Sequence, residues 1–280
     1  MAQEKLDSLK ENIHEKFATG GGDYALAFKE LKTGGTEILI NAKEDFHAAS
    51  TMKTPVMIEV FKQASEGKFG LDDSVLVKNS FKSIVDSSEF SLNLTDDGGE
   101  ELYNFIGKKR TIRQLVYNMI TVSSNLATNI LIDKVGAKNV MKTMKEIGAD
   151  DIKVLRGVED IKAFDLGMNN TTTAYDLMLI FERIADGKVV SKEACGEMIN
   201  ILLDQKFNSR IPAELPKDVK VAHKTGSISG VEHDSGIVFL PEGKKYVLVI
   251  LAKNLKDMNK GTETEADVSK MIYDFVAGGN

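Results

Sequence analysis

The stretch Phe46-His47-Ala48-Ala49-Ser50-Thr51-Met52-Lys53-Thr54-Pro55 lies where a strand-like segment gives way to an apolar, helix-like run over residues 56–64. A serine at such a junction can project its hydroxyl toward the unpaired N–H groups of the helix start. Lys53 follows Ser50 by three positions and shares its helical face. A partly buried lysine loses its proton more readily, and serine becomes a nucleophile when a neighbour removes its proton. The pattern predicts a nucleophilic serine; a helix cap followed by a surface lysine is the competing interpretation.

The composition is that of an ordinary globular protein with an acidic balance. The 280 residues include 36 Lys and Arg against 42 Asp and Glu, a formal net charge of −6. This charge, without a basic block, argues against nucleic acid or an anionic membrane as the main partner. The single cysteine, Cys195, excludes an internal disulfide and is expected to be a buried structural thiol. The four histidines lack metal-site spacing, so we expect no metal and no other cofactor.

Neither a membrane-spanning helix nor a signal peptide is predicted. The longest apolar run, residues 246–252, is a candidate buried strand. The chain opens with Met1-Ala2-Gln3-Glu4-Lys5 and leads directly into a polar helix. The protein is therefore expected to be either cytoplasmic or a mature form with an added methionine.

The order of periodic segments predicts an α/β (α+β) fold. Strands are predicted at residues 24–28, 37–41, 220–226, 236–240 and 245–252. Helices are predicted at residues 3–18, 56–64, 138–147, 171–184, 191–204 and 264–276, with two more opening at Thr111 and Asn125. The polar segment 86–101 is expected to be an exposed excursion.

This order predicts two domains. Residues 1–54 and 212–280 are expected to form a mixed domain of sheet and helices, and residues 55–211 an all-helical domain. Pockets often form between two such bodies, and Ser50 and Lys224 both lie at this junction by their positions in the sequence.

Two further motifs follow the opening stretch. Ser123-Ser124-Asn125 stands at a predicted helix start, and His223-Lys224-Thr225-Gly226-Ser227 lies on a predicted strand. The ordered set Ser-x-x-Lys, Ser-x-Asn and Lys-Thr-Gly resembles the class A β-lactamases and the related penicillin-binding proteins. The resemblance covers nearly the whole chain and extends to Thr111-Ile112-Arg113-Gln114-Leu115 and Asn170-Thr171-Thr172-Thr173.

The resemblance implies a β-lactamase/transpeptidase-like fold, in which an antiparallel five-stranded sheet is flanked by the terminal helices and joined to an all-helical lobe. It implies that Ser50 attacks the carbonyl of a β-lactam or an acyl-D-alanyl peptide. Lys53 would help to remove the serine proton, and Ser123 would relay a proton to the leaving nitrogen.

The resemblance also implies the binding roles. Asn125 would hydrogen-bond the substrate's side-chain amide, and Lys224 and Thr225 would bind its carboxylate. Gly226 would let the strand pass close to the ligand. The backbone N–H groups of Ser50 and Ser227 would form the oxyanion hole, two fixed donors where negative charge develops.

Two histidines lie beside these motifs. His223 is expected to orient or pack against the site. His233 lies near the position where β-lactamases often carry an arginine that supports the carboxylate site, so it would either do that work more weakly or simply pack.

Release of an acyl-serine requires an activated water. The resemblance implies a glutamate on an Ω-shaped loop for this task, and Glu159 falls at the family's distance after Ser123, with Asp160 as the alternative. The loop departs from the family pattern, because Lys162 and Ala163 stand where a leucine and a water-holding asparagine are usual.

The closure of this loop differs too. The family uses an Arg–Asp ion pair; Arg156 is near the place of the arginine, but Asn170 stands where the aspartate would be. Asn169 or Asn170 could supply a substitute hydrogen bond, and Asp165 could pair with Arg156.

Three hypotheses are therefore compared. The first is a class A β-lactamase whose acyl-serine is released by Glu159, and the second a D-Ala-D-Ala peptidase or serine esterase with slow deacylation. The third, a non-catalytic sensor, requires a dead nucleophile, yet every acylation residue is present. The expected partner is a small-molecule substrate and the expected state a monomer, without stable membrane insertion. By family precedent the mature protein would be periplasmic or secreted.

Overall fold

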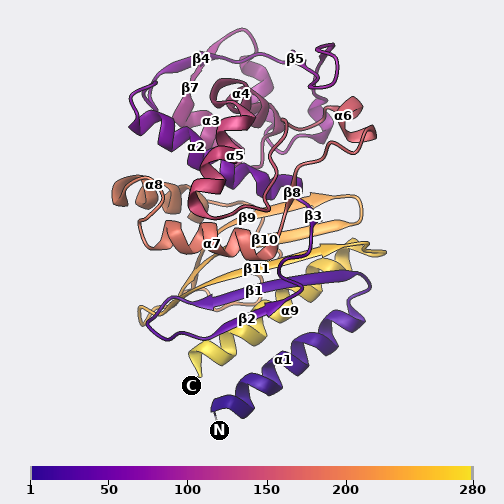
Figure 1. The fold of residues 1–280 in the computed structure, drawn as a ribbon, viewed down its shortest axis with the longest axis vertical. Coiled ribbons are helices and arrows are strands. Elements are labelled where there is room, and N and C mark those ends of the chain that lie inside the picture. Colours follow the sequence, from indigo (N-terminus) through magenta and orange to yellow (C-terminus); the bar gives the residue numbers. More distant parts are fainter. Residues whose placement is uncertain (1, 279–280) are drawn as a thin grey trace.

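The computed structural model describes residues 2–278 of the chain. At its centre lies one five-stranded antiparallel sheet with the strand order β2-β1-β11-β10-β9 (Figure 1). Its strands are β1 (Asp23–Glu30), β2 (Glu37–Ile40), β9 (Lys220–Ile228), β10 (Val231–Phe239) and β11 (Lys245–Lys253). All five predicted strands therefore lie in the same sheet.

The sheet is buried on both faces, which explains the continuous apolar sequence of β11. Successive side chains of a strand point to opposite faces. Tyr246, Leu248 and Ile250 therefore belong to the core under the terminal helices, whereas Val247 and Val249 belong to the core under the helical lobe.

The two terminal helices, α1 (Ala2–Thr19) and α9 (Met258–Ala277), cover one face of the sheet together (Figure 1). Their apolar stripes, which include Leu9 and Ile13 on α1 and Val268 and Ile272 on α9, join the sheet in one core. None of the helices within residues 2–278 has the length and apolar character needed to cross a membrane.

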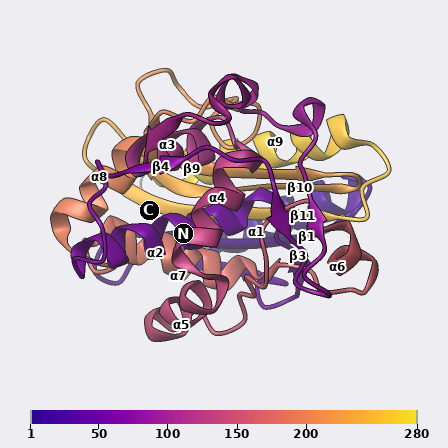
Figure 2. The ribbon, with the colours of Figure 1, turned by 90° about the horizontal axis from the view of Figure 1, so that it is seen from above.

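The other face carries the helical lobe, which Figure 2 shows from above. Its helices are α2 (Lys53–Ser65), α3 (Ile112–Thr121), α4 (Asn125–Val135), α5 (Ala137–Ile147), α6 (Ile161–Asp165), α7 (Ala174–Ala185) and α8 (Lys192–Leu203). Three 3₁₀ helices accompany them: η1 (Ala49–Met52), η2 (Leu94–Asp96) and η3 (Glu100–Phe105). Helix α7 packs on β1, β10 and β11, and α8 packs on β9.

The segment predicted to be all-helical also contains short strands. The strand β3 (Phe46–His47) pairs with β8 (Thr171–Thr172), β4 (Ser74–Leu76) with β7 (Lys109–Thr111), and β5 (Phe81–Lys82) with β6 (Glu89–Phe90). Strands of two or three residues are too short to show a periodicity. The division into two domains at residues 54 and 211 stays a prediction.

Helix caps fix the starts of the elements that carry the site. Thr111 and Gln114 form a capping box on α3, and Thr173 caps α7. The predicted exposure of segment 86–101 is wrong in part, because Leu92 and Asp97 are buried. Asp97 accepts the backbone N–H groups of Asn125 (2.9 Å) and Leu126 (2.8 Å), which supplies the unpaired donors of α4 with an acceptor.

Candidate active site

Ser50 stands in η1, between β3 and the first turn of α2. The turn is held by Thr51, whose hydroxyl donates to the Ala48 carbonyl (2.6 Å), and by the Ala49 N–H, which donates to His47 Nδ1 (3.0 Å). The strand-to-helix junction predicted for the serine is therefore a short strand followed by a 3₁₀ turn.

Lys53 lies fully buried at the start of α2. Its ammonium donates to the carbonyl oxygen (2.7 Å) and Oγ (3.1 Å) of Ser123 and to Asn125 Oδ1 (2.8 Å). Burial lowers the pKa of Lys53 to about 7, although the negative charges of Asp97 and Glu159 oppose the shift. A large fraction of this side chain is therefore neutral near pH 7 and able to accept a proton.

Ser123 is the point where two lysines meet. Its Oγ lies 3.1 Å from the ammonium of Lys53 and 3.1 Å from that of Lys224. Its neighbour Ser124 is the residue that caps α4, by accepting the N–H of Ala127 (3.2 Å). The two adjacent serines thus have different roles. Ser124 caps the helix, and the hydroxyl of Ser123 faces the site.

Strand β9 forms the opposite wall. Lys224 is fully buried and also donates to the Thr225 carbonyl (2.9 Å). Burial lowers its pKa well below the ordinary value, and the charge of Lys53 acts in the same direction. A Cβ at Gly226 would lie 3.1 Å from the backbone nitrogen of Ser50, so only glycine lets β9 pass this close to the nucleophile without a shift of its neighbours. The exposed Ser227 follows directly.

Two cavities flank Ser50, and Ser50, Asn125 and Ser227 line both. The more polar cavity, about 350 Å³, is completed by Gly98, Ser123, Phe207, Arg210 and Thr225. The other, about 430 Å³, extends beneath the 156–170 loop, and its further lining includes Glu159, Ile161, Phe164 and Ile228.

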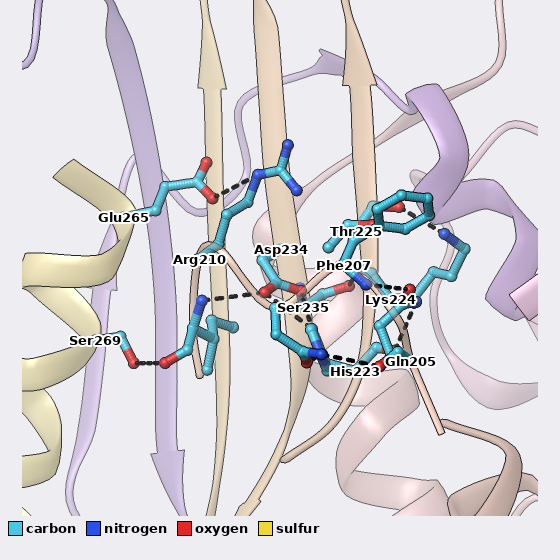
Figure 3. Close-up of polar contacts among 12 residues, drawn as sticks. Gln205, Phe207, Arg210, His223, Lys224, Thr225, Asp234, Ser235, Glu265 and Ser269 are labelled. Atoms are coloured by element: carbon cyan, nitrogen blue, oxygen red, sulfur yellow. Dashed lines mark hydrogen bonds and ion pairs between the residues drawn. The ribbon is translucent and has the colours of Figure 1, made fainter. Parts of the chain in front are cut away.

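Arg210 is a site residue that the sequence motifs did not reveal. It lies in the irregular segment after α8, and its guanidinium pairs with Glu232 of β10. Figure 3 shows its second acidic neighbour, Glu265 of α9, at 3.7 Å. Glu232 also accepts the Ser227 hydroxyl (3.0 Å). Burial raises the pKa of Glu265 well above its ordinary value, although the charge of Arg210 opposes the shift.

His233 packs; it does not face the substrate. It is fully buried, its Nε2 donates to the His47 carbonyl (2.8 Å), and its Nδ1 accepts the Ala252 N–H (3.2 Å). Burial lowers its pKa to about 4, so the ring is neutral at neutral pH. Of the two roles considered for His233, these buried contacts favour packing, and Arg210 is a cation in the lining of the more polar cavity.

His223 orients the segment that carries Arg210, as expected. Its Nδ1 lies 2.9 Å from Asp234 Oδ1 and its Nε2 lies 3.1 Å from Asn208 Oδ1 (Figure 3). Asp234 in turn accepts the N–H of Ile211 (3.1 Å). These buried contacts bind residues 208–211 to strands β9 and β10.

Glu159 reaches the site from the loop beneath α4. Its carboxylate accepts Asn125 Nδ2 (2.8 Å) and the Asn93 N–H (3.3 Å). The alternative base, Asp160, is buried and engaged elsewhere: it accepts the Ser83 hydroxyl and the Ile84 N–H, both at 2.9 Å, and caps α6. Glu159 is thus the carboxylate of this pair that meets the predicted site residues.

The loop is closed without an Arg–Asp pair. The Arg156 guanidinium donates to Asn169 Oδ1 (3.4 Å) and the Met168 carbonyl (3.0 Å), and Asn170 Nδ2 donates to the Arg156 carbonyl (3.0 Å). Both asparagines therefore supply hydrogen bonds in place of the family's Arg–Asp ion pair. Asp165 is exposed and, within residues 2–278, forms no ion pair with Arg156, so that pairing is wrong.

Backbone strain is concentrated around these side chains. Among the described residues, six other than glycine have a positive φ, and three of them are Ala49 (44°), Ser123 (58°) and Glu159 (62°). Such conformations cost about 1–3 kcal/mol each and persist where surrounding contacts enforce them. Within residues 2–278 no group of three or more His, Cys, Asp and Glu side chains is placed to hold a metal ion.

The chain was compared with known proteins. The sequence profile described as the β-lactamase enzyme family matches residues 8–276. The chain is 24% identical to the β-lactamase BRO-1 of Moraxella catarrhalis over 243 residues, which cover 83% of this chain and 74% of that protein. The solved structure of PBP-A has a TM-score of 0.82 at 26% identity and covers 98% of this chain and 97% of its own.

A mutant of PBP-A, equally similar, was solved as an acyl-enzyme complex with penicillin G. A β-lactamase from Sphaerobacter thermophilus has a TM-score of 0.80 at 25% identity, covering 97% of this chain and 98% of its own. The predicted fold is confirmed by these likenesses. Because the family profile spans nearly the entire sequence, the chain belongs to the β-lactamase enzyme family.

Proposed function

We propose that this protein hydrolyses β-lactams in two steps through an acyl-enzyme on Ser50. One observation carries the proposal: the ammonium groups of Lys53 and Lys224 both lie 3.1 Å from Ser123 Oγ, in a cavity wall that Ser50 shares. Burying two lysine side chains against the same hydroxyl lowers the stability of the folded protein, so the arrangement indicates a function. It is suited to a proton relay between the nucleophile and the leaving group.

In the acylation step, neutral Lys53 takes the proton of Ser50, whose Oγ attacks the ring carbonyl. The N–H groups of Ser50 and Ser227 receive the negative charge on the carbonyl oxygen. The ring C–N bond then breaks, and the Ser123 hydroxyl passes a proton to the leaving nitrogen and receives in its place the proton that Lys53 took from Ser50. The pKa of about 7 for Lys53 supports its role as the base.

Substrate binding uses both cavities. The ring carboxylate binds in the more polar cavity, near Arg210, Lys224 and Thr225, where the guanidinium of Arg210 offsets its charge and Lys224 and Thr225 supply further hydrogen-bond donors. The acyl side chain extends into the other cavity and its amide contacts Asn125.

In the deacylation step, Glu159 takes a proton from a water molecule that attacks the ester carbonyl. The ester bond breaks, and the proton that Glu159 took from the water returns to the Ser50 oxygen, which restores both residues. The cavity that Glu159 and Ser50 line together supports this assignment.

Intact-protein mass spectrometry with penicillin G and turnover of nitrocefin test the proposal. We expect a transient adduct that Ser50→Ala abolishes, steady turnover by the wild type, and a long-lived adduct in Glu159→Gln. Labelling that persists in Ser50→Ala would refute the site.

The second candidate is a penicillin-binding peptidase or esterase with slow deacylation. It is favoured by the loop, since Lys162 pairs with Asp86 (2.8 Å) and Ala163 is buried. A permanent wild-type adduct without turnover would select it. For either activity we expect a periplasmic or secreted monomer.

A further inference from the structure

Asn125 joins the two bases of the proposed reaction. Its Oδ1 accepts from Lys53 Nζ (2.8 Å), and its Nδ2 donates to Glu159 Oε1 (2.8 Å). The orientation of the amide follows from Glu159, because a carboxylate can only accept and therefore requires the NH₂ group of the amide. Asn125 is also the first residue of α4, whose start is held by Asp97.

Two side chains that follow Glu159 in its loop are apolar or engaged elsewhere. Lys162 points to Asp86 (2.8 Å) and Ser88 (2.7 Å), and Ala163 has no polar side-chain atom. The two contacts described for the Glu159 carboxylate come from the amide of Asn125 and the backbone of Asn93, both outside the loop.

Helix α4 also holds the main chain just before Glu159. Asn129, one turn after Asn125, accepts the Val158 N–H (2.7 Å) and donates to the Val158 carbonyl (3.0 Å). A Cβ at Gly157 would lie 2.2 Å from Asn129 Oδ1, so glycine is needed for this approach. The backbone and the carboxylate of the base are thus both held by one face of α4.

From these contacts we propose that Asn125 is a positioning residue for Glu159 in deacylation, in addition to its contact with the substrate amide. This inference rests on the proposed function, since it requires Glu159 to be the base.

A double-mutant cycle tests the inference. The decay of the penicillin G adduct is measured by quench and mass spectrometry in the wild type, Asn125→Ala, Glu159→Gln and the double variant. Loss of a hydrogen bond to a charged group should make the decay roughly 10- to 100-fold slower in Asn125→Ala. In the Glu159→Gln background the same change should slow it by less than about threefold, because the base that it positions no longer acts.

An equal slowing in both backgrounds would overturn the inference and leave the proposed function intact. Unchanged decay in Glu159→Gln alone would remove the proposed base itself, and the inference with it. The two failures are therefore distinct.

A pH profile supplies a readout that a purely structural role would not move. Asn125→Asp keeps the shape of the side chain but places a second carboxylate beside Glu159, which makes Glu159 harder to ionise. The fall of the adduct decay rate at acidic pH, its acid limb, should therefore move to higher pH. An unmoved limb would contradict the inference. Asn139→Ala is the matched control, because this amide donates to the Val135 carbonyl (2.7 Å) at the far end of α4 and should leave decay and limb unchanged.

Discussion

A single buried lysine connects the sequence to the chemistry at the residue scale. Lys53 is fully buried, and its pKa of about 7 means that it is protonated below neutral pH and neutral above it. Only the neutral form can accept the proton of Ser50. The rate of acylation should therefore rise as the pH increases through about 7.

Lys53→Met removes the base and should lower the acylation rate by roughly 10²- to 10⁴-fold at every pH. Adduct formation with penicillin G, followed across neutral pH, checks both statements. Lys68→Met is the control, since Lys68 lies on the surface and pairs with Glu66. If the acylation rate of the wild type does not fall as the pH is lowered through neutrality, another group removes the proton of Ser50.

Arg210 and His233 make a second contrast between single residues. Arg210→Ala should raise KM for penicillin G at least roughly tenfold with a smaller change in kcat, because a charged hydrogen-bond donor to the carboxylate is lost. His233→Gln should leave KM nearly unchanged, since the ring is buried and neutral.

Arg210→Ala alone leaves the buried Glu232 without its partner, which can cost about 3–5 kcal/mol of stability. The double variant Arg210→Ala with Glu232→Gln removes both charges and separates binding from folding. Steady-state kinetics and thermal unfolding measure the two effects. A normal KM in the double variant would contradict the role of Arg210.

The elements differ in how far their sequences predict them. Strands β9, β10 and β11 each have nine residues, and the turn signals around them are strong, so the central sheet is predictable. The pair β3–β8 is two residues long and forms because distant segments meet, which no local pattern encodes.

The candidate site shows the same difference. Ser50, Ser123 and Lys224 belong to ordered motifs, whereas Arg210 stands in an irregular segment whose partners, Glu232 and Glu265, come from later elements. A single arginine without a motif gives no signal for such a role. The polar character of segment 86–101 indicates exposure, because nothing in the local sequence shows that Asp97 accepts the first N–H groups of α4.

Helix α6 should determine which acyl side chains are accepted. Ile161 and Phe164 are 62% and 48% exposed, and with Ile228 they line the larger cavity. Burial of this apolar surface favours aromatic or aliphatic acyl groups over charged ones. Phe164→Ser should reduce kcat/KM for penicillin G roughly tenfold relative to 6-aminopenicillanic acid, which lacks the acyl group.

Leu166→Ser is the control for this prediction, because Leu166 follows α6, is 65% exposed and does not belong to the lining described for the cavity. Competition between the two substrates measures the preference directly. An equal loss for both substrates would mean that Phe164 supports the loop and does not select the side chain.

At the scale of the whole molecule, the site is built from both bodies of the fold. Lys53 and Ser123 come from the helical lobe and Lys224 from the sheet, and they meet in one hydrogen-bonded group. The core beneath the lobe is continuous with the sheet, since Val247 and Val249 of β11 cluster with residues of α2, α4 and α7. The helical lobe and the sheet each need the other to bury their side of this core. We therefore expect them to unfold together.

A substitution far from the site tests this cooperativity. Ile272→Ala on α9 removes a fully buried side chain from the core on the opposite face of the sheet and should cost about 2–5 kcal/mol. Because the sheet joins both cores, thermal loss of activity, of helical circular dichroism and of calorimetric heat should move down together, with one transition each. If the helical lobe kept its transition temperature while the sheet unfolded at a lower temperature, the two would be independent domains. The contact between Lys224 and Ser123 would then be lost before the helices unfold.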